Sequence, residues 1–394
     1  MIDAITDFDH AISPTTPETF FADHFERAPL IVRRNAPDHY AGLLSMADVD
    51  HAVTSLAMTH ADLQLVRTGE HVAAQDFCDD NGFVDPIRAT REFTGGATMV
   101  MPALHRRLPR LASYCRALER VFSADLQTNI YLTPADAQGF NTHYDSHDVI
   151  VLQVEGSKEW RLYESDLKLP MRAQRFSPDG FEPGPVTETF TLHAGDMLYL
   201  PRGIVHDARA TDEVSLHVTT GLMTRTWTDL MLEAVASVAL ADVDFRRTLP
   251  PGYATGIGRE AARATFRDLM TRVADRADAD AALDTFAADH VAGRRPVVAG
   301  HFTDALAAAD LAPDSVAGGR PDLIATIAED AGEDVVRLDC YGREVCLPLH
   351  AAETLRAAVG TGRYRIADLP GEIDDAGKVV LVRRLVREGA VRLL

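Results

Sequence analysis

A series of short β-type runs occupies the middle of the chain, between Leu126 and Leu222. Each run is rich in β-branched, aliphatic and aromatic residues, and Pro, Gly or Asp residues stand between them. The runs are LQTNIYLTP, HDVIVLQVEG, KEWRLY, ETFTLHAGDMLYLPRG and EVSLHVTTGL. Several short strands in succession are typical of a sandwich or a closed barrel, so this region is predicted to form the β core of the protein.

Helices are predicted before and after this β core in the sequence. The segment TTPETFFADHFERAPLIVRR predicts a helix and then a strand, and Ser45 with Asp48 has the spacing of a capping box. Apolar residues that recur every three or four positions predict one amphipathic helix between Leu104 and Phe122. After the β core, residues 227 to 292 are rich in Ala and are predicted to be helical.

The last part of the chain predicts helices and a β-hairpin around Tyr341-Gly342. This pattern favours a small winged-helix-like domain. A chain of 394 residues exceeds what one hydrophobic core usually supports. We therefore expect three parts: a β-containing domain over residues 1–225, a helical region over 226–295 and the winged-helix-like domain over 296–394.

Composition narrows the choice of partners and compartment. The formal net charge of −20 opposes non-specific binding to nucleic acid and favours basic partners, although acidity also keeps many proteins in solution. No basic stretch followed by an apolar run opens the sequence, so we expect neither secretion nor membrane insertion. The four cysteines form no C-x-x-C pair, which favours a reducing cytoplasm. They are Cys78, Cys115, Cys340 and Cys346.

Three residues are candidates for metal ligands. His143 and Asp145 stand two apart in a β context, where such side chains point to the same face. His206 follows a tight Pro-Arg-Gly turn, and a closed sheet can return it beside the first pair. Two imidazoles and one carboxylate leave positions open on an ion, as in non-haem Fe(II) oxygenases, but catalytic zinc also accepts three protein ligands. The triad therefore predicts a metal centre without naming the metal.

The blocks around these residues, NTHYDSHDVIVLQVEGSKEWRLY and TLHAGDMLYLPRGIVHDA, resemble the JmjC-type ribosomal oxygenases. The resemblance extends to ETFFADHFERAPLIVRR near the N-terminus and to the order of the three parts. It implies an α+β chain with a double-stranded β-helix of the jelly-roll or cupin type. It also implies that His143, Asp145 and His206 bind iron and that the helical region forms a homodimer.

The resemblance further implies 2-oxoglutarate as a co-substrate. Lys158 matches the family's basic residue for the distal carboxylate, and a dicarboxylate does need a cation at one end and a metal at the other. Without the resemblance, Lys158 would be interpreted as a solvated turn lysine. Asn129, His217 and Thr219 match residues that line the same pocket, and Tyr131 joins them because it shares the face of Asn129.

The implied function is hydroxylation of a protein side chain, a His or Arg of a ribosomal protein, coupled to conversion of 2-oxoglutarate to succinate. No residue besides the metal ligands is expected to act in the chemistry. Two alternatives within enzymes stay open, a hydroxylase of another peptide such as a natural-product precursor and a demethylase. A third alternative is a non-catalytic scaffold that binds protein or nucleic acid, which the intact triad and Lys158 oppose.

Two further features qualify this interpretation. Ser146-His147-Asp148 departs from the family's usual acidic and apolar residues beside the iron, which predicts a different substrate choice. Neither His147 nor His193 is expected to be a ligand. The last predicted helix is basic, but residues 321–394 hold ten Lys and Arg against thirteen Asp and Glu, which makes nucleic acid an improbable partner. The basic residues of this helix are Lys378, Arg383, Arg384 and Arg387.

Overall fold

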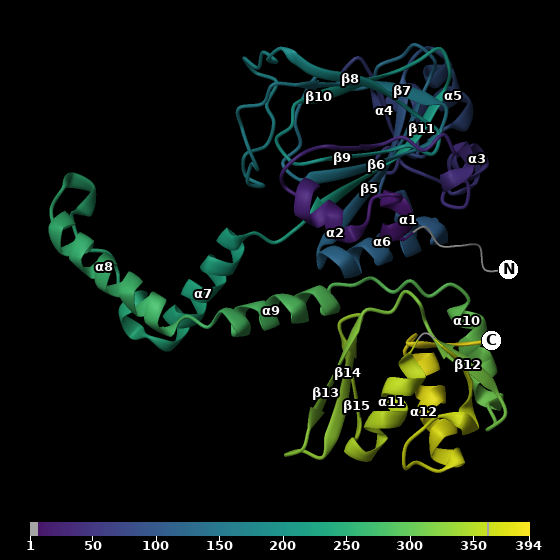
Figure 1. Ribbon diagram of the computed structural model, residues 1–394, viewed down its shortest axis with the longest axis vertical. Coiled ribbons are helices and arrows are strands. Elements are labelled where there is room, and N and C mark those ends of the chain that lie inside the picture. The colour runs from purple at the N-terminus through teal and green to yellow at the C-terminus, as the bar shows by residue number, and fades with distance from the viewer. Residues whose placement is uncertain (1–6, 361) are drawn as a thin grey trace. The chain divides into compact units, whose positions relative to one another are not determined.

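The computed structural model describes residues 7–360 and 362–394. The chain divides into two compact units, of which the first ends at Thr224 and the second begins at Arg225 (Figure 1). Each unit has its own hydrophobic core. Among the described residues, no helix is both long and apolar enough to cross a membrane.

The first unit is built on two antiparallel sheets (Figure 1). The larger sheet has the order β1 (Leu30–Val32), β9 (Met197–Leu200), β6 (Asp148–Glu155), β11 (Ser215–Met223), β5 (Asp125–Thr133), β4 (Thr98–Pro102), β2 (Gln64–Arg67) and β3 (Glu70–His71). The smaller sheet has the order β10 (His206–Ala210), β7 (Ser157–Tyr163) and β8 (Val186–His193). The predicted β core and its double-sheeted cupin architecture are therefore present.

Strand β6 shows why two sheets form. Successive side chains along a strand point to opposite faces, yet all residues of β6 but the last are buried. Ile150 and Leu152 pack into the main core, whereas Val149 and Val151 pack against apolar residues of β7 and β8. Both faces of this strand are thus covered, one by helices and one by the smaller sheet.

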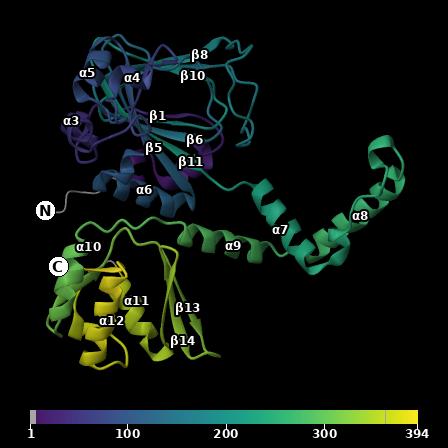
Figure 2. The same cartoon turned by 180° about the vertical axis from the view of Figure 1, so that it is seen from behind.

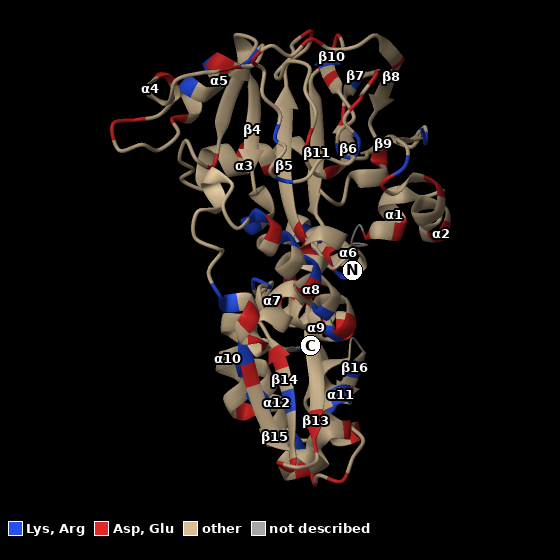
Figure 3. Cartoon of the chain, turned by 90° about the vertical axis from the view of Figure 1, so that its left-hand side faces the viewer, with Lys and Arg blue, Asp and Glu red and all other residues tan. Residues whose placement is uncertain are grey.

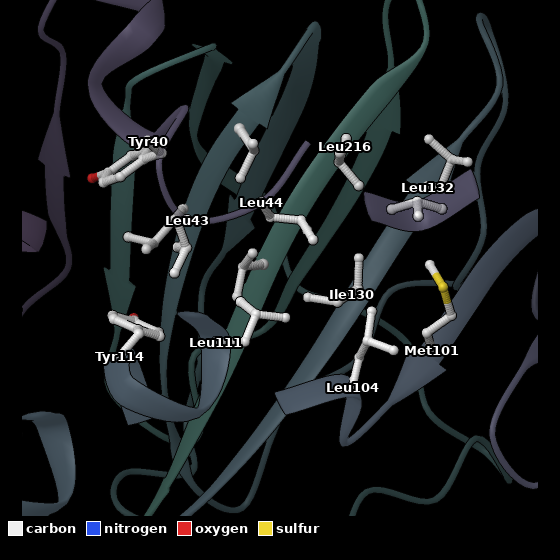
Figure 4. Packing of buried hydrophobic residues seen from close by; sticks show 14 of the residues in the cluster. Tyr40, Leu43, Leu44, Met101, Leu104, Leu111, Tyr114, Ile130, Leu132 and Leu216 are labelled. Atoms are coloured by element: carbon white, nitrogen blue, oxygen red, sulfur yellow. The ribbon is translucent and has the colours of Figure 1, made fainter. Parts of the chain in front are cut away.

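Helices and turns of the first unit pack on the outer face of the larger sheet, where Leu43, Leu111 and Ile130 meet in the core (Figure 4). The predicted capping box of Ser45 and Asp48 is present. The helical elements are α1 (Phe8–Ile12), α2 (Pro17–Thr19), the π-helix Phe20–His24, the 3₁₀ turns Pro37–Tyr40 and Leu104–Arg106, α3 (Met46–Ser55), α4 (Ala74–Phe77), α5 (Pro86–Thr94) and α6 (Pro109–Phe122).

The prediction of one helix from Leu104 to Phe122 is wrong in its first turn. A 3₁₀ turn ends at Arg106, and α6 begins only at Pro109. Leu108 has extended backbone angles, because the ring of a following proline disfavours the helical conformation of the preceding residue.

The second unit begins with helices, as the Ala-rich sequence predicts. They are α7 (Trp227–Ala241), the 3₁₀ turns Val243–Arg246 and Tyr253–Thr255, α8 (Arg259–Arg276) and α9 (Ala279–Ala292). Few of their apolar residues are buried within the chain; Val238, Val273 and Val291 are examples of those that are.

The rest of the second unit combines two three-stranded sheets with short helices (Figure 2). One sheet has the order β13 (Ala325–Asp330), β14 (Val335–Cys340) and β15 (Arg343–Pro348), and the other has β16 (Arg363–Arg365), β12 (Val316–Gly319) and β17 (Val391–Leu393). The helices are α10 (His301–Ala307), α11 (Ala352–Val359) and α12 (Asp375–Arg387), with 3₁₀ turns at Ala308–Asp310, Leu349–Ala351 and Ile366–Asp368. The predicted hairpin joins β14 to β15, and both Tyr341 and Gly342 have the positive φ that a tight hairpin turn requires.

Candidate metal centre and its cavity

His143, Asp145 and His206 come together in the first unit although His206 is distant from the other two in the sequence. One possible ligand atom of each residue lies within 4.8 Å of the others. Nε2 of His206 is 3.8 Å from Oδ2 of Asp145, and the two imidazole centroids are 4.6 Å apart. His206 is buried, and the other two are half-buried. The predicted triad is therefore a geometrically sound candidate for a metal centre.

His206 is the first residue of β10, whereas His143 and Asp145 lie outside any regular strand. The prediction of a β context for His143 and Asp145 is wrong, because their segment is irregular apart from one isolated bridge. It connects β5 to β6, and its bridge is to His206 on β10, an edge strand of the smaller sheet. At the bridge the amide of His143 donates to the carbonyl of His206 at 3.0 Å, and the amide of His206 donates to the carbonyl of His143 at 2.8 Å.

Hydrogen bonds also fix the orientation of both imidazoles. Nδ1 of His143 lies 2.8 Å from the carbonyl oxygen of Asn141, and Nδ1 of His206 lies 2.9 Å from that of Ile204. Because a carbonyl only accepts, Nδ1 carries the proton in each ring and Nε2 keeps its lone pair for a metal. Burial, reinforced by the neighbouring His143, lowers the pKa of His206 to about 4, so this ring is neutral near pH 7, as a ligand must be.

A cavity of about 300 Å³ adjoins the triad between the two sheets. Strands β5, β6 and β11 line one side, and β7 and β10 line the other. All five predicted co-substrate residues line this same cavity. They are Asn129, Tyr131, Lys158, His217 and Thr219.

Lys158 is the most unusual of these residues, because its side chain is a buried cation. Only 4% of the residue is exposed, and its Nζ donates to the hydroxyl of Thr133 at 3.1 Å. No ion pair with a carboxylate is found for it among the residues that the structure describes. Burial lowers the pKa of Lys158 to about 7. An anion in the cavity would supply the missing charge partner.

The remaining four predicted residues form two neighbouring pairs across β5 and β11. Tyr131 stands opposite His217, and Asn129 stands opposite Thr219. The rings of Tyr131 and His217 stack with centroids 4.8 Å apart. Within the described part of the chain, Oδ1 of Asn129 and Nδ1 of His217 are buried without a hydrogen-bond partner. Buried polar atoms are normally satisfied, so these two atoms point to a polar ligand.

Sequence reasoning missed part of the cavity lining. Trp160 was predicted to belong to the core, and it does pack there, but it also lines the cavity. His147 lines the cavity as well, and it is not among the three metal-ligand candidates. A Cβ on Gly221 would lie 2.8 Å from Cε1 of His147, so the imidazole lies where a side chain of β11 would otherwise be. A glycine inside a strand is the signal that could have indicated this close approach.

Comparisons with known proteins agree with this architecture. The family model of the JmjC domain matches residues 103–230. Ribosomal oxygenase 1 of Gallus gallus is 32% identical over 292 residues, which cover 69% of this chain and 48% of that protein. The bifunctional lysine-specific demethylase and histidyl-hydroxylase NO66 of Dictyostelium discoideum is 32% identical over 264 residues, which cover 63% of this chain and 49% of that protein. The chain spans about half the length of the curated relatives it matches.

Among solved structures, the ribosomal oxygenase YcfD of Escherichia coli superimposes with a TM-score of 0.53 at 16% identity, covering 96% of this chain and 98% of that chain. The fold and the site thus define a cupin-type protein with a JmjC domain. More particularly, the chain is a homologue of the ribosomal oxygenases, which confirms the resemblance that the sequence blocks indicated.

Proposed function

We propose that this chain is an Fe(II)- and 2-oxoglutarate-dependent oxygenase that hydroxylates a protein side chain, a His or Arg of a ribosomal protein. The observation that carries this proposal is one cavity in which a two-His, one-carboxylate triad adjoins a buried lysine without a carboxylate partner among the described residues. A metal at the triad and a cation in the wall are what a chelating dicarboxylate requires.

The donor atoms fit Fe(II). His143 and His206 offer neutral imidazoles, and Asp145 offers a carboxylate, so three hard or borderline ligands are available for a divalent ion. Zinc accepts the same ligands, but the E. coli protein YcfD, whose fold is similar, has been solved in complex with cobalt and succinic acid. That pairing supports an oxygenase metal and a dicarboxylate in this type of cavity. Bound Fe(II) would supply the activation of oxygen.

The protein's own residues would bind and orient the co-substrate. Lys158 would donate to the distal carboxylate of 2-oxoglutarate, assisted by the hydroxyl of Thr133. Asn129 and His217 have unpartnered polar atoms for further hydrogen bonds, and Thr219 and Tyr131 complete the lining. Val149, Val151 and Trp160 line the same cavity with apolar surface, which excludes water from the reaction.

The substrate is inferred from the relatives and from charge. Their names describe ribosomal oxygenases and a histidyl-hydroxylase, and a net charge of −20 favours basic partners such as ribosomal proteins. The name of the Dictyostelium relative also includes lysine demethylation, which uses the same kind of oxidant and is the second candidate.

The decisive experiment measures succinate release by the purified chain with Fe(II), 2-oxoglutarate and oxygen, with and without ribosomal proteins of its host. Mass spectrometry of those proteins follows. Stimulated release with one protein heavier by one oxygen atom would support the proposal. Release without stimulation would redirect the search to other peptides, and absence of release from metal-loaded protein would favour a scaffold.

We also propose that the helical region around residues 226–295 forms a homodimer. Its apolar side chains are largely exposed within the single chain, which is unfavourable unless a partner covers them. The most exposed are Trp227, Met231, Leu232, Leu240, Leu249, Ile257 and Phe266. Light scattering of the full chain tests this, and the mass of a monomer would contradict it.

Residues 296–394 are proposed to be a winged-helix-like module that does not bind nucleic acid. Three of the four basic side chains of α12 are engaged within the unit: Lys378 donates to the carbonyl of Ala367, Arg383 donates to that of Ala308, and Arg384 pairs with Glu388. Acidic positions of the same unit include some on the β13–β15 sheet (Figure 3). All four cysteines are unpaired, which supports a reducing cytoplasm as the compartment.

A further inference from the structure

Asp207 directly follows the ligand candidate His206 on β10, and its carboxylate is almost fully buried. Only 1% of the side chain is exposed. The carboxylate accepts three hydrogen bonds: from Oγ1 of Thr142 at 2.6 Å, from the hydroxyl of Tyr163 at 2.6 Å and from Nε of Arg161 at 2.8 Å. This group has no role in the proposed chemistry.

The three donors come from two places that matter for the metal centre. Thr142 is the residue immediately before His143. Arg161 and Tyr163 lie on β7, and Arg161 stands directly opposite Asp207 in the pairing of β7 with β10. One carboxylate therefore ties β10, which carries His206, to the segment that carries His143 and to the neighbouring strand β7.

We propose that Asp207 is a positioning residue for the metal centre. It keeps the His143 and His206 segments side by side before a metal arrives, so that the metal does not have to order its own ligands. The proposal rests on the assignment of these two histidines as metal ligands.

The geometry around His143 favours this role over simple stabilisation of the sheet. The segment of His143 has no strand ladder and is held to His206 by two backbone hydrogen bonds. The hydrogen bond from Thr142 to Asp207 is a further link between the segment of His143 and β10, one residue away from the backbone bridge. If the carboxylate were lost, the hydroxyls of Thr142 and Tyr163 would lose their acceptor, and the segment could shift by more than a metal site tolerates.

The test is titration of the metal-free full chain with Co(II), followed by calorimetry and by the visible absorption of the bound ion. Asp207→Asn should raise the Kd for Co(II) by roughly 10- to 100-fold, the range typical of residues that orient metal ligands, and should alter the absorption bands. Thr142→Val and Tyr163→Phe keep the carboxylate and remove one donor each, so each should show a smaller rise. These two variants retain a readout if Asp207→Asn does not fold.

Asp196→Asn is the matched control. Asp196 is also a buried carboxylate of the first unit, and it accepts from the backbone amides of Arg34 and His193 at 2.8 and 2.9 Å, but it does not line the cavity. This variant should lower the melting temperature and leave the Co(II) affinity unchanged. Wild-type affinity in Asp207→Asn, or an equal loss in Asp196→Asn, would overturn the inference. Failure of the wild-type chain to bind Co(II) would instead overturn the metal assignment itself.

Discussion

The two units of the chain depart from ordinary burial in opposite directions. The first unit buries groups that usually face water, such as Lys158 and His217. The second unit exposes groups that usually avoid water: Trp227 is 78% exposed, Leu240 is 80% exposed and Phe266 is 63% exposed. A buried polar group and an exposed apolar patch are both informative departures, the first indicating a small polar ligand and the second a protein partner. The predictions below test each side of this comparison.

The largest effect is expected at the triad. His143→Ala or His206→Ala leaves two protein ligands, which would hold Fe(II) poorly, so succinate release should fall by more than about 100-fold, beyond the usual effect of an outer residue. His193→Ala is the control, because this exposed histidine does not line the cavity. Unchanged succinate release in either triad variant would remove the assignment.

The next effect is expected at the buried cation. Lys158→Ala removes a charge-assisted hydrogen bond worth about 1.5–3 kcal/mol, so the apparent KM for 2-oxoglutarate should rise by roughly 10- to 100-fold. The Kd for Co(II) should stay the same, because Lys158 is not among the metal-ligand candidates. An unaltered KM would contradict the proposed role.

Charged substitutions on the exposed apolar surface of the second unit test the proposed homodimer. Phe266→Glu combined with Leu240→Glu should halve the mass measured by light scattering, because two carboxylates cannot be buried without partners in a dimer interface. Ile87→Glu is the matched control, since Ile87 is an equally exposed aliphatic residue of the first unit, at 75% exposure. An unchanged mass in the double variant would place the interface elsewhere.

Lys158 also predicts a pH dependence of stability in the absence of ligand. Its pKa falls from 10.5 to about 7 on burial, so the unfolded chain binds more protons than the folded chain between these values. The free energy of unfolding should therefore increase as the pH rises from about 7 to 10.5, because this residue then loses its proton in the unfolded chain as well. Urea unfolding of the wild type and of Lys158→Met should diverge over this range, and parallel curves would contradict the lowered pKa.

The smallest effect is expected where β11 approaches His147. Gly221→Ala places a Cβ against the imidazole and should cost roughly 1–3 kcal/mol of unfolding free energy through overpacking. His147→Ala should relieve much of that cost when both changes are combined. A double-mutant cycle by urea unfolding measures the interaction energy of the two positions. Strictly additive effects would show that these positions do not interact.

The sequence predicted those parts of the first unit that have a local signal. Runs such as HDVIVLQVEG alternate between two apolar faces and formed the predicted strands. Strand β10 was not predicted, because HDARA contains no β-branched or aromatic residue and becomes a strand only by pairing with β7. The triad was predicted, but its convergence depends on a bridge between distant residues, which no local pattern shows.

Residues that act through several partners were the hardest to predict. Asp207 looks like an ordinary surface acid in the sequence, and only the fold brings Thr142, Arg161 and Tyr163 to its carboxylate. His147 is predicted not to be a ligand, and its place in the cavity depends on the missing side chain of Gly221. Long-range register decided each of these features.

The reciprocal backbone bonds between His143 and His206 make the centre observable without any metal or substrate. Each of these amide protons is shielded from solvent only while the two segments remain paired. Their hydrogen exchange rates therefore report how often the empty centre opens, and a variant that loosens it would be recognised by two amides before any turnover is measured.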